Sequence, residues 1–469
     1  MKKLLPLVAA MALASQAAYA DINNIATTTQ DGSGNAAMTE QTSLTNSEAG
    51  ITQTGDDNKS EVLQSNGDEA AATVSSIGNR NIANITQDAS SNVDASITQD
   101  GYHNKGYIYQ ITGTDQSEAT VIQTGDRNKA TIHQKFHTGG ATASITQENS
   151  FDAVADIYQK DADNSIATIS QSNFVGYSDN GANIIQDKGN TLNATIDQES
   201  TVDDTALIDQ TGDNQTANIH QKNFNVRGNT SITQTGAGNG AIIDQTWSGG
   251  STAAIIQADS DNIANINQYN SDDSSADINQ GGSLQNAKIT QKNAPGVGAG
   301  QGNDADIIQT GGSNESAIMQ DGYRNTAMVT QGGTGNKAFV DQTGNDNKAT
   351  VNQTGVTQFA DVDQVGTDSE AIVNQTGTSQ KAYINQSGTS NLSDILQEVS
   401  GNLADIDQSG EFNEADIDQT GTSNEAWIIQ SGMGALAANT ATITQSASND
   451  YALITQTVGA GNSATITQQ

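Results

Sequence analysis

An 11-residue repeat is the feature that most constrains how this chain can fold. Ile or Val, then any residue, then Gln recurs about 35 times along the sequence, and from Gln309 to Gln430 it returns every 11 residues without slipping. A short unit repeated at fixed spacing cannot bury its apolar side chains alone and must stack on copies of itself. The repeat therefore predicts a solenoid.

The order of residues inside one unit predicts a β-strand. In the clearest unit, Asn128, Ala130, Ile132 and Gln134 occupy every second position after Gln123. Alternate residues of a strand share one face, so these four side chains point inward and the residues between them point outward. A second copy repeats the pattern position for position, with Gln342, Asn347, Ala349, Val351 and Gln353.

The residues between two such strands predict a tight turn. Four residues, 124–127 in the first unit, separate one predicted strand from the next, with Gly125 able to supply a positive φ. Four residues are too few for a crossover helix, so consecutive strands must face each other across a thin core as a β-arc. The prediction is an all-β fold, a parallel β-solenoid of stacked β-arcs with about 22 residues per rung and amyloid-like cross-β geometry. Roughly 36 strands, two per rung at about 4.8 Å, give a rod of about 85 Å.

Stacking at this period predicts two columns of buried glutamines. Each amide is expected to donate to the rung on one side and accept from the other, which removes the cost of burying an unpaired polar group. The apolar positions add about 1.5–3 kcal/mol for each fully buried side chain. One column comprises Gln320, Gln342, Gln364, Gln386, Gln408 and Gln430, and the other comprises Gln309, Gln331, Gln353, Gln375, Gln397 and Gln419.

Three segments are expected along the chain. Lys2, Lys3, the apolar stretch 4–13 and Ala18-Tyr19-Ala20 are typical of a secretory signal peptide, residues 1–20. Residues 21–52 hold degenerate units around Gln30 and Gln41, and residues 53–469 form the regular repeat array.

The composition of the chain limits the classes of partner that it can bind. The formal net charge of −36 makes nucleic acid an improbable partner, and no later segment is apolar enough to span a bilayer. The absence of Cys excludes disulfides and thiolate metal sites. Low hydrophobicity with high charge is typical of disorder, but the repeat favours a stacked final state.

No residue pattern predicts catalysis or a cofactor. The sequence shows no nucleophile with a partner base, no P-loop and no dinucleotide fingerprint. His133 and His220 fall on outward positions and are interpreted as surface residues rather than metal ligands. Acidic stretches such as 415–419 offer oxygens for Ca²⁺, but the nonapeptide of calcium-binding β-rolls is absent, so no metal site is assigned.

The unit Gln-x-Gly-x-x-Asn-x-Ala-x-Ile-x-Gln resembles the curlin repeat of curli fibres, the functional amyloid of bacterial biofilms. The resemblance is clearest at 123–134 and 342–353 and extends over 53–468. It implies a subunit exported through an outer-membrane pore, kept unfolded in transit and templated by a nucleator subunit into cell-surface fibres. This chain has many more repeats than the familiar curlin and no evident Gly-rich secretion segment.

The leading functional hypothesis is a secreted structural subunit that polymerises with copies of itself. The last unit, with Ile466 and Gln468, is expected to be the polymerisation edge, since an uncovered rung templates another chain. One alternative is a monomeric solenoid adhesin or ice-binding module, which needs a regular outward array of Thr or aromatic residues, and the outward positions look too mixed for it. A solenoid carbohydrate enzyme is a third class, but short uniform turns leave little material for a catalytic groove.

Overall fold

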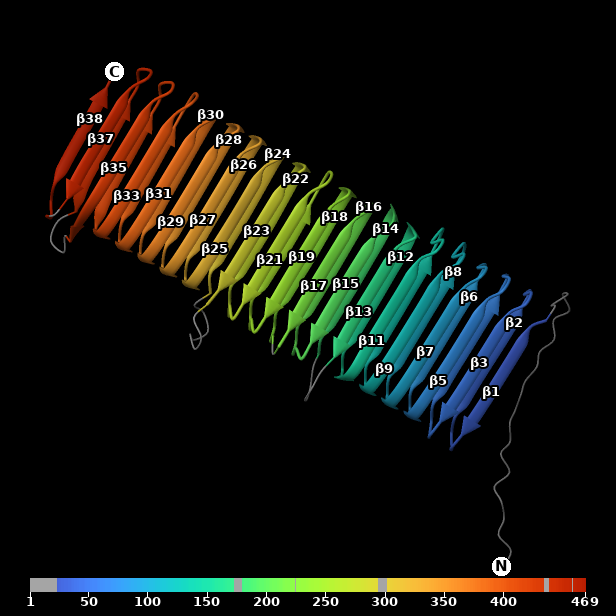
Figure 1. Ribbon diagram of the computed structural model, residues 1–469. Coiled ribbons are helices and arrows are strands. Elements are labelled where there is room, and N and C mark those ends of the chain that lie inside the picture. Colours follow the sequence, from blue (N-terminus) through green and yellow to red (C-terminus); the bar gives the residue numbers. More distant parts are fainter. Residues whose placement is uncertain (1–22, 173–178, 224, 294–301, 434–437, 458) are drawn as a thin grey trace, which may run out of the picture.

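The computed structural model describes residues 23–469 except 173–178, 224, 294–301, 434–437 and 458. The described residues form 38 β-strands and no helix. The predicted signal peptide, residues 1–20, lies outside the described residues. The strands follow one another along a rod in sequence order, as the colours of Figure 1 show.

The odd-numbered strands form one parallel sheet of 19 strands. They are β1 (Ile25–Asp31), β3 (Glu48–Thr54), β5 (Ala71–Asn79), β7 (Asp94–Tyr102), β9 (Glu118–Asp126), β11 (Thr142–Phe151), β13 (Ile166–Ser172), β15 (Asn193–Glu199), β17 (Thr216–Lys222), β19 (Gly240–Thr246), β21 (Ile263–Tyr269), β23 (Asn286–Lys292), β25 (Glu315–Tyr323), β27 (Lys337–Asn345), β29 (Phe359–Thr367), β31 (Lys381–Thr389), β33 (Leu403–Glu411), β35 (Glu425–Met433) and β37 (Tyr451–Thr457).

The even-numbered strands form a second parallel sheet, also of 19 strands. They are β2 (Ala36–Thr42), β4 (Lys59–Ser65), β6 (Ile82–Asp88), β8 (Lys105–Ile111), β10 (Lys129–Lys135), β12 (Val154–Asp163), β14 (Gly181–Asn190), β16 (Thr205–Asp213), β18 (Asn229–Ala237), β20 (Thr252–Gln257), β22 (Ser275–Ser283), β24 (Asp304–Gly312), β26 (Thr326–Thr334), β28 (Lys348–Val356), β30 (Glu370–Thr378), β32 (Leu392–Gln397), β34 (Asn413–Gln419), β36 (Asn439–Gln445) and β38 (Ser463–Gln468).

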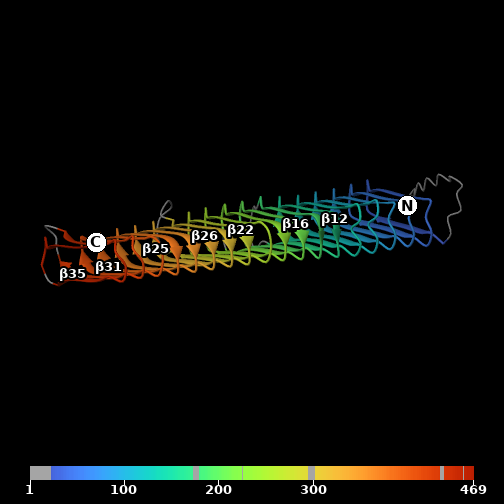
Figure 2. The same cartoon turned by 90° about the horizontal axis from the view of Figure 1, so that it is seen from above.

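The two sheets face each other, and the chain alternates between them (Figure 2). Each strand pairs in parallel with the strand two elements further on, so that Gln320 lies opposite Gln342 and Gln331 opposite Gln353. The predicted fold, a parallel β-solenoid of stacked β-arcs, is confirmed. Its 19 rungs span about 86 Å at about 4.8 Å per step.

The rungs are close to the expected length of about 22 residues, but their length varies along the chain. Successive glutamines of a column are 22 residues apart between Gln309 and Gln430, but 23 residues separate Gln30 from Gln53 and 29 separate Gln280 from Gln309. The Gln columns stay in register across these longer intervals. The extra residues therefore lie in the turns, where they do not disturb the core.

The turns are shorter than the four residues predicted from the sequence. Strand β9 runs through Asp126, and only Arg127 and Asn128 separate it from β10. Residues expected in the turn also pair with their counterparts one rung away, as Gly101 does with Gly125. Stacking extends the strands into the bend.

Glycine is required in these bends for two reasons. Gly344 has a φ of +114°, and a Cβ on it would lie 2.0 Å from the carbonyl oxygen of Gly366 in the next rung. The residue before the turn Asn also adopts a positive φ, 57° at Asp346 and 60° at Arg127. The sequence indicated the first of these positions but not the second.

The core consists of the alternate inward residues. In β27, Ala338, Val340 and Gln342 are each at most 2% exposed, and the residues between them are more exposed. Residues 23–52, the degenerate segment, contribute β1, β2 and most of β3 to the same two sheets. Here Thr28 and Thr39 take the places that Ile or Val holds elsewhere.

Candidate functional site

The structure buries every residue that the sequence analysis assigned to the core ladders. Each is at most 1% exposed. They are Gln123, Asn128, Ala130, Ile132, Gln134, Gln309, Gln320, Gln331, Gln342, Asn347, Ala349, Val351, Gln353, Gln364, Gln375, Gln386, Gln397, Gln408, Gln419 and Gln430.

The glutamines bond along the rod axis. Gln320 Nε2 donates to Gln342 Oε1 at 2.9 Å, and Gln342 Nε2 donates to Gln364 Oε1 at 2.8 Å. The column in the other sheet repeats this, with Gln331 Nε2 donating to Gln353 Oε1 at 2.8 Å. Each amide therefore has a partner above and below.

Each glutamine also ties the two sheets together, which the sequence analysis did not predict. Gln342 Nε2 donates to the carbonyl oxygen of Thr326 in β26 at 3.1 Å, and Gln353 Nε2 donates to that of Lys337 in β27 at 2.9 Å. Both amide protons thus have acceptors, which offsets the desolvation cost of a buried side-chain amide. The spacing of 16 residues from Gln to acceptor is the signal that could have revealed this bond.

Wherever two glutamines of a column bond to each other, the donor is the one with the lower residue number, so the columns share one direction. Gln30 and Gln41 in the first rung donate to Gln53 and Gln64, which leaves their own Oε1 atoms facing the N-terminal end. In the last rung, Gln468 Nε2 bonds only across the core, to the carbonyl oxygen of Tyr451 at 3.1 Å. One end of the rod thus presents amide acceptors and the other presents amide donors.

At the C-terminal end of the rod, strand β38, which contains Ile466 and Gln468, is less buried than strand β37 of the other sheet. Strand β38 pairs with β36 alone, and its inward residues are half-buried rather than buried. Ile466 packs against the core cluster from this position.

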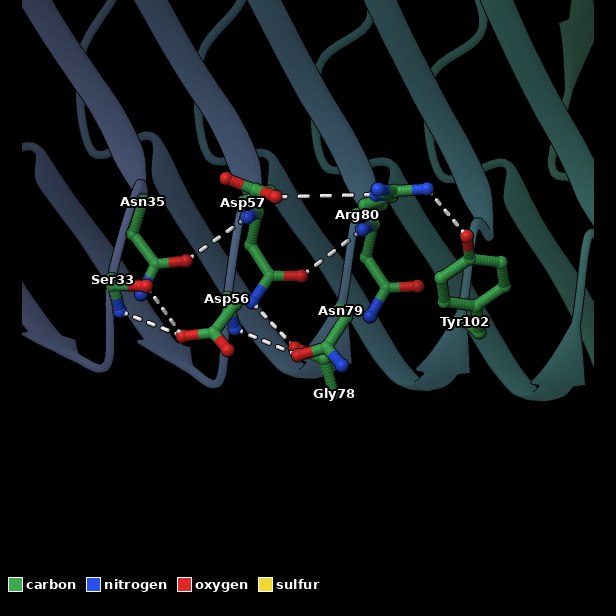
Figure 3. A network of polar contacts seen from close by, with 10 residues as sticks. Ser33, Asn35, Asp56, Asp57, Gly78, Asn79, Arg80 and Tyr102 are labelled. Carbon is green, nitrogen blue, oxygen red and sulfur yellow. Dashed lines mark hydrogen bonds and ion pairs between the residues drawn. The ribbon is translucent and has the colours of Figure 1, made fainter.

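Asparagines form a second ladder at the turns. The backbone N–H of Asn347 donates to Asn325 Oδ1 at 3.1 Å, and Asn347 Nδ2 donates to the carbonyl oxygen of Gly366 at 3.1 Å. The same arrangement holds in the first rungs, where Oδ1 of Asn35, labelled in Figure 3, accepts from the N–H of Asn58 at 2.9 Å.

The turns carry a further polar chain that the sequence analysis missed. In Figure 3, Asp56 Oδ1 accepts from the N–H of Ser33 at 2.8 Å, and Asn79 Oδ1 accepts from the N–H of Asp56 at 2.8 Å. Arg80 donates to the Tyr102 hydroxyl at 2.6 Å on the same edge. In the sequence, this series of hydrogen bonds is marked by a polar residue two positions before the buried turn residue.

Serine interrupts one Gln column. Ser76 replaces Gln, and its hydroxyl donates to Gln99 Oε1 at 3.3 Å. Gln53, one rung earlier, turns its Nε2 to Ser60 Oγ at 2.9 Å instead. The break is local, since the column resumes from Gln99 to Gln123 at 2.9 Å.

The two outward histidines lie in different surroundings. His133 stacks on Tyr109 with ring centroids 4.7 Å apart, and burial and the nearby Lys135 charge lower its pKa. His220 Nδ1 lies 2.6 Å from Asp244 Oδ1. Among the described residues, no group of three or more His, Cys, Asp or Glu side chains has the geometry to hold a metal ion.

Acidic side chains on the outer faces are partly desolvated. Asp394 lies opposite Asp416 in the register, and burial raises the pKa of both carboxyl groups. Burial raises the pKa of Asp306 to about 6, and the charges of Asp304 and Asp277 add to the shift. The outer faces therefore hold carboxyl groups that take up protons more readily than free aspartate.

In the odd-numbered sheet, the kind of side chain at the outward positions differs between regions of the chain. The two central outward columns of β1 to β13 hold no charged residue. They consist of Thr27, Thr29, Gly50, Thr52, Thr73, Ser75, Ser96, Thr98, Thr120, Ile122, Ser144, Thr146, Thr168 and Ser170. We call these two columns the hydroxyl face. The corresponding positions of the even-numbered sheet include Glu40, Glu61, Tyr107, Tyr109 and Asp156.

These features define a class of protein, a parallel β-solenoid stabilised by buried amide ladders. Seven matches to the curlin associated repeat fall within it, at residues 114–148, 300–331, 322–355, 344–377, 366–398, 400–432 and 437–469. The chain is a curlin-repeat protein. No curated protein matches the sequence. Within the described residues, no helix is long and apolar enough to cross a membrane.

Proposed function

We propose that this curlin-repeat protein is a secreted structural subunit of an extracellular curli-like fibre and that it assembles head to tail. Curlin repeats indicate a curli-type structural subunit. The observation that supports polymerisation is the common direction of the Gln columns, because it makes the two ends of the rod complementary.

The register defines the junction between two molecules. Strands β37 and β1 belong to one sheet and β38 and β2 to the other. Stacking the last rung on the first rung of the next molecule lets Gln456 donate to Gln30 and Gln468 donate to Gln41. Head-to-head stacking would instead place acceptors against acceptors. The head-to-tail contact is heterologous and does not close, so it propagates into a filament.

Electron microscopy and fibre diffraction of the purified chain test the assembly. We expect long unbranched fibres with a meridional reflection near 4.7–4.8 Å and an equatorial reflection near 10 Å. Monodisperse particles about 86 Å long, with no fibres under any seeding condition, would contradict polymerisation.

A matched pair of variants tests the junction itself. Ile466→Lys puts a charge on the inward face of β38, whereas Thr467→Lys puts it on the exposed face. We expect Ile466→Lys to slow seeded elongation about tenfold or more, because the junction would bury an unpaired charge, and Thr467→Lys to change it little. A bulky polar domain fused after Gln469 should also block elongation while leaving the monomer soluble. Unchanged elongation in both the Ile466→Lys variant and the fused form would contradict growth through this rung.

The route to the cell surface is part of the proposal. Residues 1–20 have the charge and apolar pattern of a signal peptide, and the family resemblance supports passage through the periplasm and an outer-membrane pore, followed by templating on a nucleator subunit. We propose residues 21–52 as the N-terminal segment and 53–469 as the repeat array. Mass spectrometry of the exported chain is expected to find Asp21 at its N-terminus.

The hydroxyl face favours a second candidate function, an ice-binding or adhesive module. Twelve of its 14 residues are Ser or Thr, and they repeat about every 4.8 Å between rungs and about 6.7 Å along each strand, which gives a regular two-dimensional array of hydroxyls. Along the sequence the outward positions look too mixed for such a function, because the regular array is visible only once the two sheets are separated. An uncharged lattice suits an uncharged, periodic ligand. Acidic residues such as Glu118 and Asp100 flank this face. Repulsion between like charges therefore disfavours docking of a second copy of this chain on it.

Thermal hysteresis distinguishes this candidate. Thr98→Lys alters the hydroxyl face, and Thr86→Lys alters the corresponding position of the opposite sheet. If the face binds ice, the unsubstituted protein should depress the freezing point below the melting point, and only Thr98→Lys should abolish the gap. A gap that is absent, or equally sensitive to both variants, rules this candidate out and leaves the fibre proposal untouched.

A further inference from the structure

One turn of the even-numbered sheet holds an aspartate where the ladder takes asparagine. In the usual arrangement, Asn325 Oδ1 accepts the N–H of Asn347 one rung on, and Asn325 Nδ2 donates to the carbonyl oxygen of Gly344 at 2.8 Å. Asn58 does the same with Asn81 and Gly78. The side chain thus needs one acceptor and one donor atom.

Asp204 occupies this place between Asn180 and Gly228. Its N–H donates to Asn180 Oδ1 at 3.2 Å, and its Oδ1 accepts the N–H of Gly228 at 2.6 Å. The acceptor half of the asparagine arrangement is therefore complete. The side chain is fully buried, and Oδ2 has no hydrogen-bond partner.

The unpartnered Oδ2 stands where the ladder has an amide nitrogen. That nitrogen donates to backbone carbonyl oxygens in the other rungs, so an ionised Oδ2 has the wrong polarity for the site. A protonated carboxyl group carries an O–H at this atom and can donate as asparagine does. Protonation therefore gives Asp204 both the acceptor and the donor atom that asparagine supplies at this position.

The charge environment favours the protonated form. The pKa of Asp204 is raised to about 7, mainly by burial; the Gly228 N–H and the Asn225 amide oppose this rise and the charge of Asp203 contributes to it. The side chains packed around Asp204 from the adjacent rungs, Asn180 and Asn225, are uncharged. The nearest ionisable groups in the turns, Asp203 and Arg227, are exposed.

We propose that Asp204 is a proton-controlled lock in the middle of the solenoid. When its carboxyl group is protonated, the turn that contains Asp204 is held closed against the turn of the next rung, which contains Gly228. When it is ionised, this turn opens and weakens the stack between the N-terminal and C-terminal parts. The proposal concerns closure of the solenoid and does not depend on fibre formation.

The sign of the pH effect follows from the direction of the shift. Because the folded-state pKa lies above the ordinary value of 3.8, the stability from this group is fully present below about pH 4 and is lost as pH rises through about 7. From below about pH 4 to above about pH 7, the closing equilibrium changes by roughly a thousandfold in total. Above the folded-state pKa the effect is constant.

Hydrogen exchange with mass spectrometry tests the lock on the full chain at concentrations where light scattering shows no polymer. Peptides covering 205–213 and 229–237 are compared with 348–356, a strand that contains no Asp or Glu, between pH 5 and pH 8, after correction for intrinsic exchange. We expect protection of the first two peptides to fall as pH rises, by up to roughly a hundredfold, and protection of 348–356 to change much less.

Two variants isolate the carboxyl group. Asp204→Asn supplies a permanent donor and should hold protection near the pH 5 level at pH 8, while changing little at pH 5. Asp203→Asn removes the same charge from an exposed neighbour and should retain most of the pH dependence. The proposal is overturned if Asp204→Asn shifts protection equally at both pH values, if Asp203→Asn has the same effect, or if all three peptides lose protection together in every form.

Discussion

Rungs formed by β24 to β35 repeat every 22 residues, whereas rungs formed by β1 to β23 take 23 to 29 residues. The core nevertheless has the same geometry in both regions. Gln159 donates to Gln186, 27 residues away, at 2.8 Å, and Gln342 donates to Gln364, 22 residues away, at the same distance. The Gln ladder fixes which residues lie opposite each other in adjacent rungs. It does not fix how many residues lie between them in the sequence.

The regions differ at the turns. The buried turn position is mostly Asn in β24 to β35, as at Asn325, Asn336 and Asn347. In the irregular region the same position is more varied, and it includes the apolar Leu192 and the ionisable Asp204. The Asn ladder is not confined to the 22-residue rungs, since Asn35, Asn58 and Asn81 also form it where the rungs take 23 residues.

The largest expected effect is a charge placed in the shared core. Val351→Asp in the regular region and Ile132→Asp in the irregular region should each lower the free energy of unfolding by about 3–5 kcal/mol, because each buries an unpaired carboxylate. Urea unfolding measures the loss, and Thr350→Asp on the outer face is the control. A much smaller loss at Ile132 would show that the irregular region does not share the core.

The next effect comes from the stacked glycines. Gly344→Ala should cost about 2–4 kcal/mol, because the new Cβ meets the Gly366 carbonyl oxygen and φ is positive. Gly281→Ala in the irregular region is the matched control, since its Cβ meets nothing within 4 Å. If the two variants have equal stability in the same urea titration, backbone stacking does not limit the turn.

Removing one amide from the regular ladder should cost about 1–3 kcal/mol. Gln342→Ala leaves one amide proton of Gln320 without its acceptor and Gln364 Oε1 without its donor from the preceding rung. Asp341→Ala, its outward neighbour, should change little. Equal losses at both positions, measured by thermal or urea unfolding, would mean that the inward and outward assignment is wrong.

A smaller effect should depend on pH. Because burial raises the pKa of Asp306 to about 6, its stabilising contribution is complete below about pH 4 and is lost as pH rises through about 6. Asp306→Asn should therefore flatten the stability profile between pH 4 and pH 7. Asp368→Asn, in an exposed turn, serves as the control, and identical profiles for both variants would contradict the assignment.

The smallest expected effect is a gain. Ser76→Gln restores the interrupted column between Gln53 and Gln99 and should raise the free energy of unfolding by about 1 kcal/mol. Ser75→Gln places the same side chain on the outer face and should not. A loss of stability in Ser76→Gln would show that the irregular region has adapted its packing to serine.

The sequence by itself determined the strand, the inward residues and the stacking of rungs. The alternation of Asn, Ala, Ile and Gln sets the facing of each side chain locally, and the strict period from Gln309 to Gln430 sets the register without knowledge of the fold. The prediction of the Gln columns needed only these two facts, as Gln342 between Gln320 and Gln364 illustrates.

Only the tertiary structure decided which distant residues become neighbours outside the strict repeat. The bond from Gln342 to the Thr326 carbonyl, the unpartnered Oδ2 of Asp204 and the hydroxyl face around Thr98 all depend on contacts between strands. Where rung length varies from 22 to 29 residues, counting along the chain does not identify these partners. Hydrogen bonding between rungs selects them, because the ladder fixes the register at the glutamines and leaves the extra residues to the turns.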